Sequence, residues 1–204
     1  MEQSLVNARE VYLREGRFAY TTYTLKRPFW SLFGRKYHVY SPDGGLVAYV
    51  KHPIFRLREE STIYTDESEK DPLLILRVRK LIQWNACHDV FDAKTGEKTG
   101  TIRKRTWKSI LRDTWDILDA NDQPVGLMEE EGAAFLRRLF PILTSKHRIV
   151  LGGEVVGRIK QVFRFFVKEF TLDLTMSQGR IDTRFAMACA ILALMAETRR
   201  ERQS

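Results

Sequence analysis

The strongest hydrophobic pattern in the chain is a run of twelve uncharged, largely apolar residues at positions 185–196. As a helix this run would be about 18 Å long, whereas the hydrocarbon core of a bilayer is about 30 Å thick and needs about 20 residues. A helix lying on a membrane surface needs a polar face, which the run lacks. The pattern therefore favours a helix enclosed by the protein core over a membrane anchor.

The residues that flank this run support a helix over residues 182–198. Asp182 precedes the run and is a candidate N-cap, because its side chain can accept hydrogen bonds from the first backbone N–H groups. Arg199, Arg200 and Arg202 lie near the other end, where cations interact favourably with the helix dipole.

Most of the remaining chain alternates apolar and polar residues around short turns. Four such segments cover residues 37–49, 88–102, 115–128 and 147–159. Alternation with a period of two is typical of strands with one buried face, and clusters of Asp, Asn, Gly and Pro favour tight turns. A small residue follows each turn, as expected where a strand bends or another backbone approaches; these residues are Ala48, Gly100, Gly126 and Gly157.

Further strands are expected over residues 18–25, 54–57, 73–78 and 162–174, with a hairpin loop at the acidic stretch 66–72 and a short helix within 133–143. Many antiparallel strands together with one apolar helix predict a mainly β protein. Its sheet would close into an antiparallel barrel around the C-terminal helix, because closure removes exposed edges and the interior then needs a filling. We expect a single domain over residues 18–204, preceded by an arm or edge strand over residues 1–17.

Composition narrows the possible partners. The chain has 204 residues and a formal net charge of +8, which favours polyanions such as an anionic lipid surface or nucleic acid. Of its two cysteines, Cys189 falls inside the apolar run, so the chain looks reduced and intracellular. No segment reaches transmembrane length and the N-terminus lacks the apolar stretch of a signal peptide. These features predict a cytoplasmic protein that associates peripherally with the inner membrane face.

Pairs of arginines recur three times with one residue between them. Residues i and i+2 of a strand share a face, so each pair would project two guanidinium groups together, in a geometry that suits phosphate. The alternative is a solvated outer face with no ligand. The candidate residues for an anionic head group are the three pairs and the adjacent lysines: Arg56, Arg58, Arg77, Arg79, Lys80, Arg103, Lys104 and Arg105.

A second candidate lies in residues 28–36, where aromatic residues are followed by two cations. Trp30 and Phe33 could enter a membrane interface beside Arg35 and Lys36. The alternative is ordinary aromatic packing over an open end of the barrel.

No motif for catalysis or metal binding is present. The four histidines, at positions 38, 52, 88 and 147, lie in different segments, and neither a nucleophile elbow, a zinc-binding helix nor a paired Cys-x-x-Cys occurs. We therefore expect no catalytic residues, no metal and no cofactor, and not an enzyme.

Several segments, taken in order, resemble the LURP-one-related family. They are residues 23–27, 29–33, 88–100, 112–120 and 181–188. This family is grouped with the phospholipid scramblases and the Tubby C-terminal domain. The resemblance covers about residues 18–197 and implies a barrel of about twelve strands threaded by a hydrophobic C-terminal helix.

The resemblance also implies candidate functions. Tubby-like proteins bind phosphoinositides through basic side chains outside the barrel, and scramblases carry an acidic calcium-binding segment before the terminal helix. Residues 171–180 offer one carboxylate, Asp173, where a calcium loop needs several oxygen ligands, so they do not support calcium-dependent scrambling. We expect a non-catalytic module that binds phosphoinositide-like anionic head groups. Scramblase-like lipid translocation, nucleic-acid binding and an interaction module with another ligand are the alternatives.

Overall fold

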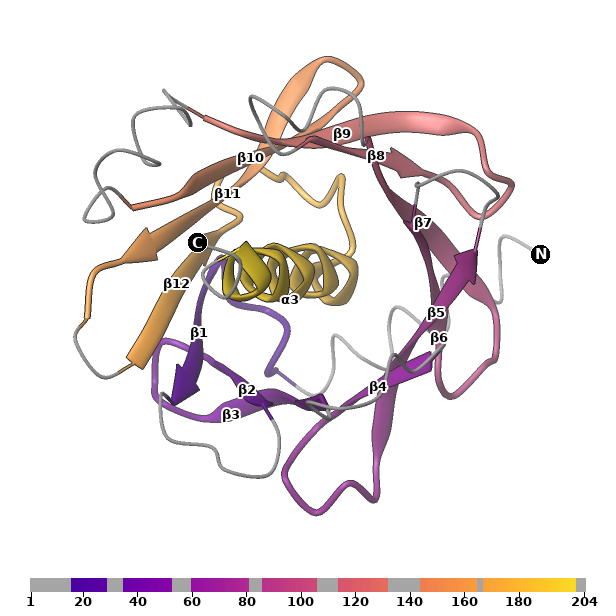
Figure 1. The fold of residues 1–204 in the computed structure, drawn as a ribbon. Helices are drawn as coiled ribbons and strands as arrows, with labels where there is room; N and C mark the ends of the chain where they lie inside the picture. Colours follow the sequence, from indigo (N-terminus) through magenta and orange to yellow (C-terminus); the bar gives the residue numbers. More distant parts are fainter. Residues whose placement is uncertain are drawn as a thin grey trace.

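The computed structural model of the protein describes residues 16–28, 35–52, 60–80, 86–105, 114–131, 144–164 and 167–200. Within these ranges the chain forms twelve strands and one helix, labelled α3 (Figure 1). The strands are antiparallel and close into a barrel, with α3 inside the ring (Figure 1). The expectation of a closed antiparallel barrel of about twelve strands around a C-terminal helix is confirmed.

The strands follow one another around the barrel in chain order, and β1 pairs with β12 to close it. Each strand therefore has a partner on both edges. The bounds are β1 Thr22–Pro28, β2 Arg35–Tyr40, β3 Leu46–His52, β4 Glu60–Tyr64, β5 Pro72–Lys80, β6 Ala86–Asp92, β7 Lys98–Lys104, β8 Thr114–Leu118, β9 Pro124–Glu130, β10 Lys146–Leu151, β11 Glu154–Val162 and β12 Val167–Asp173.

Helix α3 spans Thr183–Arg200 and fills the barrel. All residues from Phe185 to Leu194 are at most 7% exposed, as an apolar surface on every side of the helix requires. The Asp182 carboxylate caps the helix by accepting hydrogen bonds from the backbone N–H groups of Arg184 at 2.7 Å and Phe185 at 3.3 Å. Among the described residues, no helix is both long and apolar enough to span a membrane.

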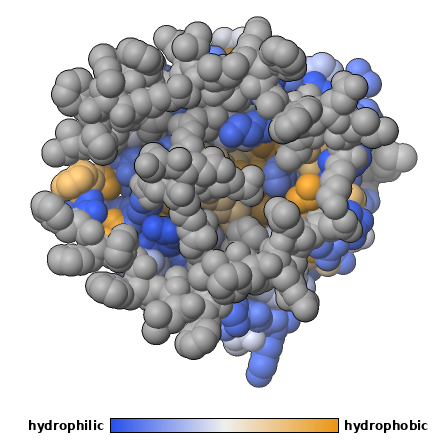
Figure 2. Space-filling view, in the orientation of Figure 1, coloured by the Kyte–Doolittle hydropathy of each residue, from blue (hydrophilic) through white to orange (hydrophobic). Residues whose placement is uncertain are grey.

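The surface reflects the alternation along the strands. On β5, Leu74 and Leu76 are buried, whereas Arg77 and Arg79 are exposed on the outer face. In Figure 2 hydrophobic and hydrophilic residues are both visible in the middle of the view, and the lower margin is hydrophilic.

The four hairpins expected from the sequence each contain a β-bulge beside the small residue that follows the turn. In each hairpin this small residue pairs with the residue just before the register shift; the pairs are Val39 with Ala48, Val90 with Gly100, Ile117 with Gly126, and Ile149 with Gly157. A Cβ added to Gly100 would lie 2.8 Å from the ring of Phe185 on α3. Small residues therefore allow the strands to bend and the helix to approach the wall.

Some predicted boundaries were wrong. The strand expected over residues 162–174 is divided, because Val162 ends β11 and β12 begins at Val167. The chain must reverse there, since Val162 and Glu169 are paired across neighbouring antiparallel strands. The expected strand at 54–57, the expected helix within 133–143 and almost all of the expected arm at 1–17 lie outside the described residues.

The burial of α3 predicts the effect of a charge within it. We expect Ala190→Asp to reduce the free energy of unfolding by several kcal/mol, because Ala190 is fully buried and its surroundings offer an apolar environment to a carboxylate. Urea unfolding measures the change, with Ala120→Asp, in an exposed turn, as the control. Equal unfolding midpoints for the two variants would show that α3 does not form the core.

The close approach at Gly126 predicts a ranking of glycine substitutions. A Cβ on Gly126 would lie 2.0 Å from the backbone oxygen of Val150, whereas one on Gly157 would be 3.0 Å from the side-chain carbon Leu174 Cδ2. We expect Gly126→Ala to destabilise the protein by about 1–3 kcal/mol or more and Gly157→Ala by less, since a side chain can move aside. Thermal unfolding tests this order, and the reverse order would contradict the register of β9 with β10.

Candidate functional site: the charged outer wall

The described members of the predicted arginine pairs all project from the outer face of the barrel and all contact carboxylates. We call Arg77, Arg79, Arg103 and Arg105 the arginine wall. Arg77, on β5, lies 2.9 Å from Glu60 of the neighbouring β4 and stacks over the ring of Phe91, with 4.9 Å between the guanidinium carbon and the ring centre. Its side chain remains 55% exposed.

Arg79 is part of a larger polar cluster. Its Nη2 atom lies 3.0 Å from Asp89 on β6 and 2.8 Å from Asp122 in the turn after β8. Lys98 also approaches Asp122, at 2.7 Å, and the Thr101 hydroxyl donates a hydrogen bond to Asp89 at 2.6 Å. Two carboxylates from distant segments are thus shared by two cations and a hydroxyl group.

Arg103 and Arg105, on and just after β7, share a single carboxylate on β8. Arg103 Nη2 lies 3.0 Å from Asp116 Oδ2, and Arg105 Nε donates to the other oxygen, Asp116 Oδ1, at 2.6 Å. Burial alone would raise the pKa of Asp116, but the hydrogen bonds and charges of Arg105 and Arg103 outweigh it and lower the pKa. Hydrogen bonds from Arg79 and Lys98 likewise lower the pKa of Asp122.

The structure places the arginine pairs of β5 and β7 on either side of β6. Strand β6 lies between β5 and β7, and the register places Cys87 between Arg79 and Arg103. Among the described residues the arginine wall therefore consists of three ion-paired groups: Arg77 with Glu60, Arg79 with Asp89 and Asp122, and Arg103 and Arg105 with Asp116. Alternation along the chain predicts on which face of its strand each arginine pair lies, but it does not predict the order of the strands in the sheet.

Lys104 lies on the opposite face of β7 from Arg103. It is two residues from the buried Ile102 and therefore lies on the same face of the strand. The Lys104 Nζ atom is 5.5 Å from the centre of the Trp115 ring. Lys80 is the last residue of β5, but the structure does not describe its side chain. Arg56 and Arg58 lie outside the described residues.

The aromatic candidate is described only in part. Trp30 and Phe33 lie outside the described residues, and Arg35 starts β2, paired in register with His52. The Lys36 ammonium lies 3.0 Å from Glu67 of the β4–β5 loop. Glu67 also contacts the buried His38 at 3.0 Å, so this acidic loop is fastened to the outside of β2.

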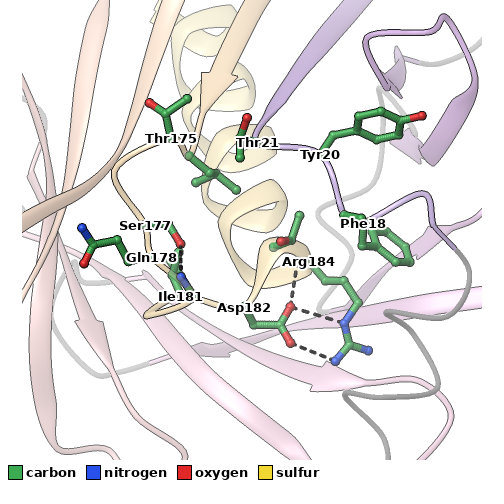
Figure 3. Close-up of a pocket in the computed structure, with 13 residues that line it drawn as sticks. Phe18, Tyr20, Thr21, Thr175, Ser177, Gln178, Ile181, Asp182 and Arg184 are labelled. Carbon is green, nitrogen blue, oxygen red and sulfur yellow. Dashed lines mark hydrogen bonds and ion pairs between the residues drawn. The ribbon is translucent and has the colours of Figure 1, made fainter.

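A cavity of about 310 Å³ lies at the N-terminal end of α3 (Figure 3). Phe18, Ile181 and Leu174 give it apolar walls, and Thr21 and Ser177 add hydroxyl groups. The first N–H groups of α3 are already bonded to Asp182, which in turn contacts Arg184 (Figure 3). The cap therefore occupies the position where a helix N-terminus would otherwise attract an anion.

Sequence reasoning missed a second group of outward cations. Lys146 and Arg148 on β10 lie directly opposite Lys160 and Arg158 on β11. All four are exposed, and we call them the β10–β11 cation face. The alternation within residues 147–159 predicts that both arginines face outward. They are ten positions apart in the sequence, however, and only the hairpin register brings them together.

In the described part of the chain, no group of three or more His, Cys, Asp or Glu side chains is arranged to hold a metal ion. The described residues thus form a closed barrel that is filled by its own helix and carries ion-paired charges on its outer face.

The sequence matches the LURP-one-related family over residues 21–193, and the chain belongs to this family.

Other comparisons add little to this family assignment. Among solved structures, the chain is similar to an X-ray structure of a protein from Arabidopsis thaliana, with 13% sequence identity and a TM-score of 0.46. The similarity covers 87% of this chain and 92% of the Arabidopsis chain. No curated protein matches the sequence.

The lowered pKa of Asp116 predicts part of the acid sensitivity of the fold. The ionised Asp116 carboxylate stabilises the folded state at pH values above the ordinary carboxyl pKa of about 4. This stabilisation is lost as the pH falls through the lowered pKa that Asp116 has in the folded protein. We expect Asp116→Asn to be less stable than the natural protein near neutral pH and to lose less stability on acidification. Urea midpoints measured between about pH 6 and pH 2 test this. Asp71→Asn, outside the cluster, is the control, and identical acid profiles for all three proteins would contradict the assignment.

Proposed function

We propose that this protein is a non-catalytic LURP-one-related module that binds phosphoinositide-like anionic phospholipid head groups through outward basic side chains. The observation that carries the proposal is the arginine wall, whose guanidinium groups are held in fixed positions by carboxylates and yet stay accessible. The side chains of Arg77, Arg79, Arg103 and Arg105 are 36–55% exposed.

Ion pairing at a surface is compatible with phosphate binding. A guanidinium group has five N–H donors in a planar fork, and one carboxylate engages only one or two of them. The Arg77–Glu60 pair is exposed on both sides, and such a pair contributes at most about 1 kcal/mol, so a phosphate group can share or displace this carboxylate at little cost. Asp89 and Asp116 are buried, so there a phosphate group would share the arginines with the carboxylates. Carboxylates that fix the arginines in advance also reduce the side-chain entropy lost when a ligand binds.

The filled interior directs this function to the outside. Because α3 occupies the barrel from Phe185 to Leu194, a lipid chain has no described apolar space within the barrel to enter. We therefore propose peripheral binding to the inner membrane face from the cytoplasm, and not lipid translocation along α3. The remaining predicted residues, Arg56, Arg58, Lys80, Trp30 and Phe33, stay candidates for the same surface.

Vesicle co-sedimentation tests the proposal. We expect the protein to sediment with phosphoinositide-containing phosphatidylcholine vesicles and not with phosphatidylcholine alone, and we expect salt to weaken the binding, because exposed charges are screened within about 8–10 Å. Band shifts with duplex DNA under the same buffers are the comparison, since a net charge of +8 also attracts nucleic acid. Equal sedimentation with both vesicle types, or binding to DNA alone, would overturn the proposal.

A further inference from the structure

The β10–β11 cation face places like charges directly opposite one another. Lys146 pairs with Lys160 and Arg148 pairs with Arg158 in the antiparallel register. Directly opposite residues of an antiparallel pair have their Cβ atoms about 4.5–5.5 Å apart, and like charges at that separation destabilise the sheet. Their alternation with the buried His147 and Ile159 keeps all four cations on the outer face.

These cations are neutralised less completely than the arginine wall. Arg148 contacts Glu129 of β9, and both nitrogens of its fork donate to the same carboxylate oxygen, Nε at 2.8 Å. Arg158 donates instead to the sulfur of Met176 at 3.2 Å, while Asp173, opposite it on β12, accepts a hydrogen bond from the Thr175 hydroxyl at 2.7 Å.

The two lysines have no carboxylate partner within 4 Å in the described part of the chain. Glu131 lies next to Lys146 across the β9–β10 pair, but the two residues are joined through the backbone. The Glu131 N–H donates a hydrogen bond to the Lys146 carbonyl oxygen at 2.7 Å. Lys160 lies opposite Thr171 on its other side. The register thus places two exposed lysines directly opposite each other, where an added anion would relieve their repulsion.

An exposed aromatic side chain lies next to this charge. Phe163, three residues beyond Lys160 at the end of β11, is 48% exposed and is the most exposed large hydrophobic residue among those described. Arg164 follows it with a side chain that is 60% exposed. Cations beside an aromatic residue at the tip of a structure suit the interface of a membrane, where head groups meet the first acyl carbons.

We propose that the β10–β11 cation face, with Phe163 at its margin, is the surface by which the protein docks on an anionic bilayer. The proposal rests on the phospholipid-binding function proposed above and names its docking face. The lysines and arginines contact lipid phosphates, and Phe163 enters the interfacial layer. This orientation places β10, β11 and the start of β12 against the membrane.

Two double variants with equal loss of charge test this docking face. Lys146→Gln with Lys160→Gln is expected to weaken partitioning onto phosphatidylserine-containing phosphatidylcholine vesicles at least about tenfold. Lys70→Gln with Lys94→Gln, which also removes two exposed cations, here from the loops after β4 and β6, is expected to change the partitioning about twofold or less, as a distant charge would. Phe163→Ser is expected to weaken binding several-fold without altering its salt dependence, because it removes no charge.

The folded state is monitored independently by thermal unfolding. Removing the opposed lysines relieves repulsion, so the unfolding midpoint of that variant should equal or exceed the natural one. If both double variants lose the same affinity, or only the variant of Lys70 and Lys94 does, the docking face is refuted while the phospholipid-binding function stands. If the natural protein fails to bind the phosphatidylserine-containing vesicles, the docking face is refuted, and the phospholipid-binding function falls only if phosphoinositide-containing vesicles also fail to bind it.

Discussion

The packing of α3 inside the barrel is the constraint on which the rest of the structure depends. A closed sheet of twelve strands leaves an interior that must be filled, because an empty apolar space loses the contacts of its lining. The apolar residues from Phe185 to Leu194 supply that filling from within the same chain. The strands around them accommodate the helix at small residues such as Gly100, where the ring of Phe185 lies against the wall.

One buried ion pair connects α3 to the barrel wall. Arg184 Nη1 donates to Asp92 Oδ2 at 2.5 Å, and both side chains are at most 7% exposed. Asp92 ends β6, and its other oxygen accepts hydrogen bonds from the backbone N–H groups of Lys94 and Thr95 in the following turn. Breaking such a pair leaves a buried charge uncompensated, at about 3–5 kcal/mol, so the pair ties the first turn of α3 to the end of β6.

The sequence predicted those parts of the structure that follow from local pattern. A run at 185–196 that is too short for a bilayer and has no polar face indicated a core helix, and alternation indicated strands with one buried side. The same alternation correctly turned Arg77 and Arg79 outward. It could not reveal their partners, because Asp122 is 43 residues from Arg79 and reaches it through the curvature and strand order of the barrel.

The two cationic surfaces show why register matters more than composition. Arginines spaced i, i+2 stand out in a sequence, yet the sheet pairs them with Asp89 and Asp116, which the spacing alone does not reveal. Lys146 and Lys160 are far apart in the sequence and inconspicuous there, but the turn at Gly152–Gly153 sets a hairpin register that makes them direct neighbours. Since like charges directly opposite one another destabilise an antiparallel pair, an anion bound between these lysines would relieve that repulsion as well as adding its own attraction. This is the physical reason why we propose β10–β11 as the face that meets a phosphate-bearing surface.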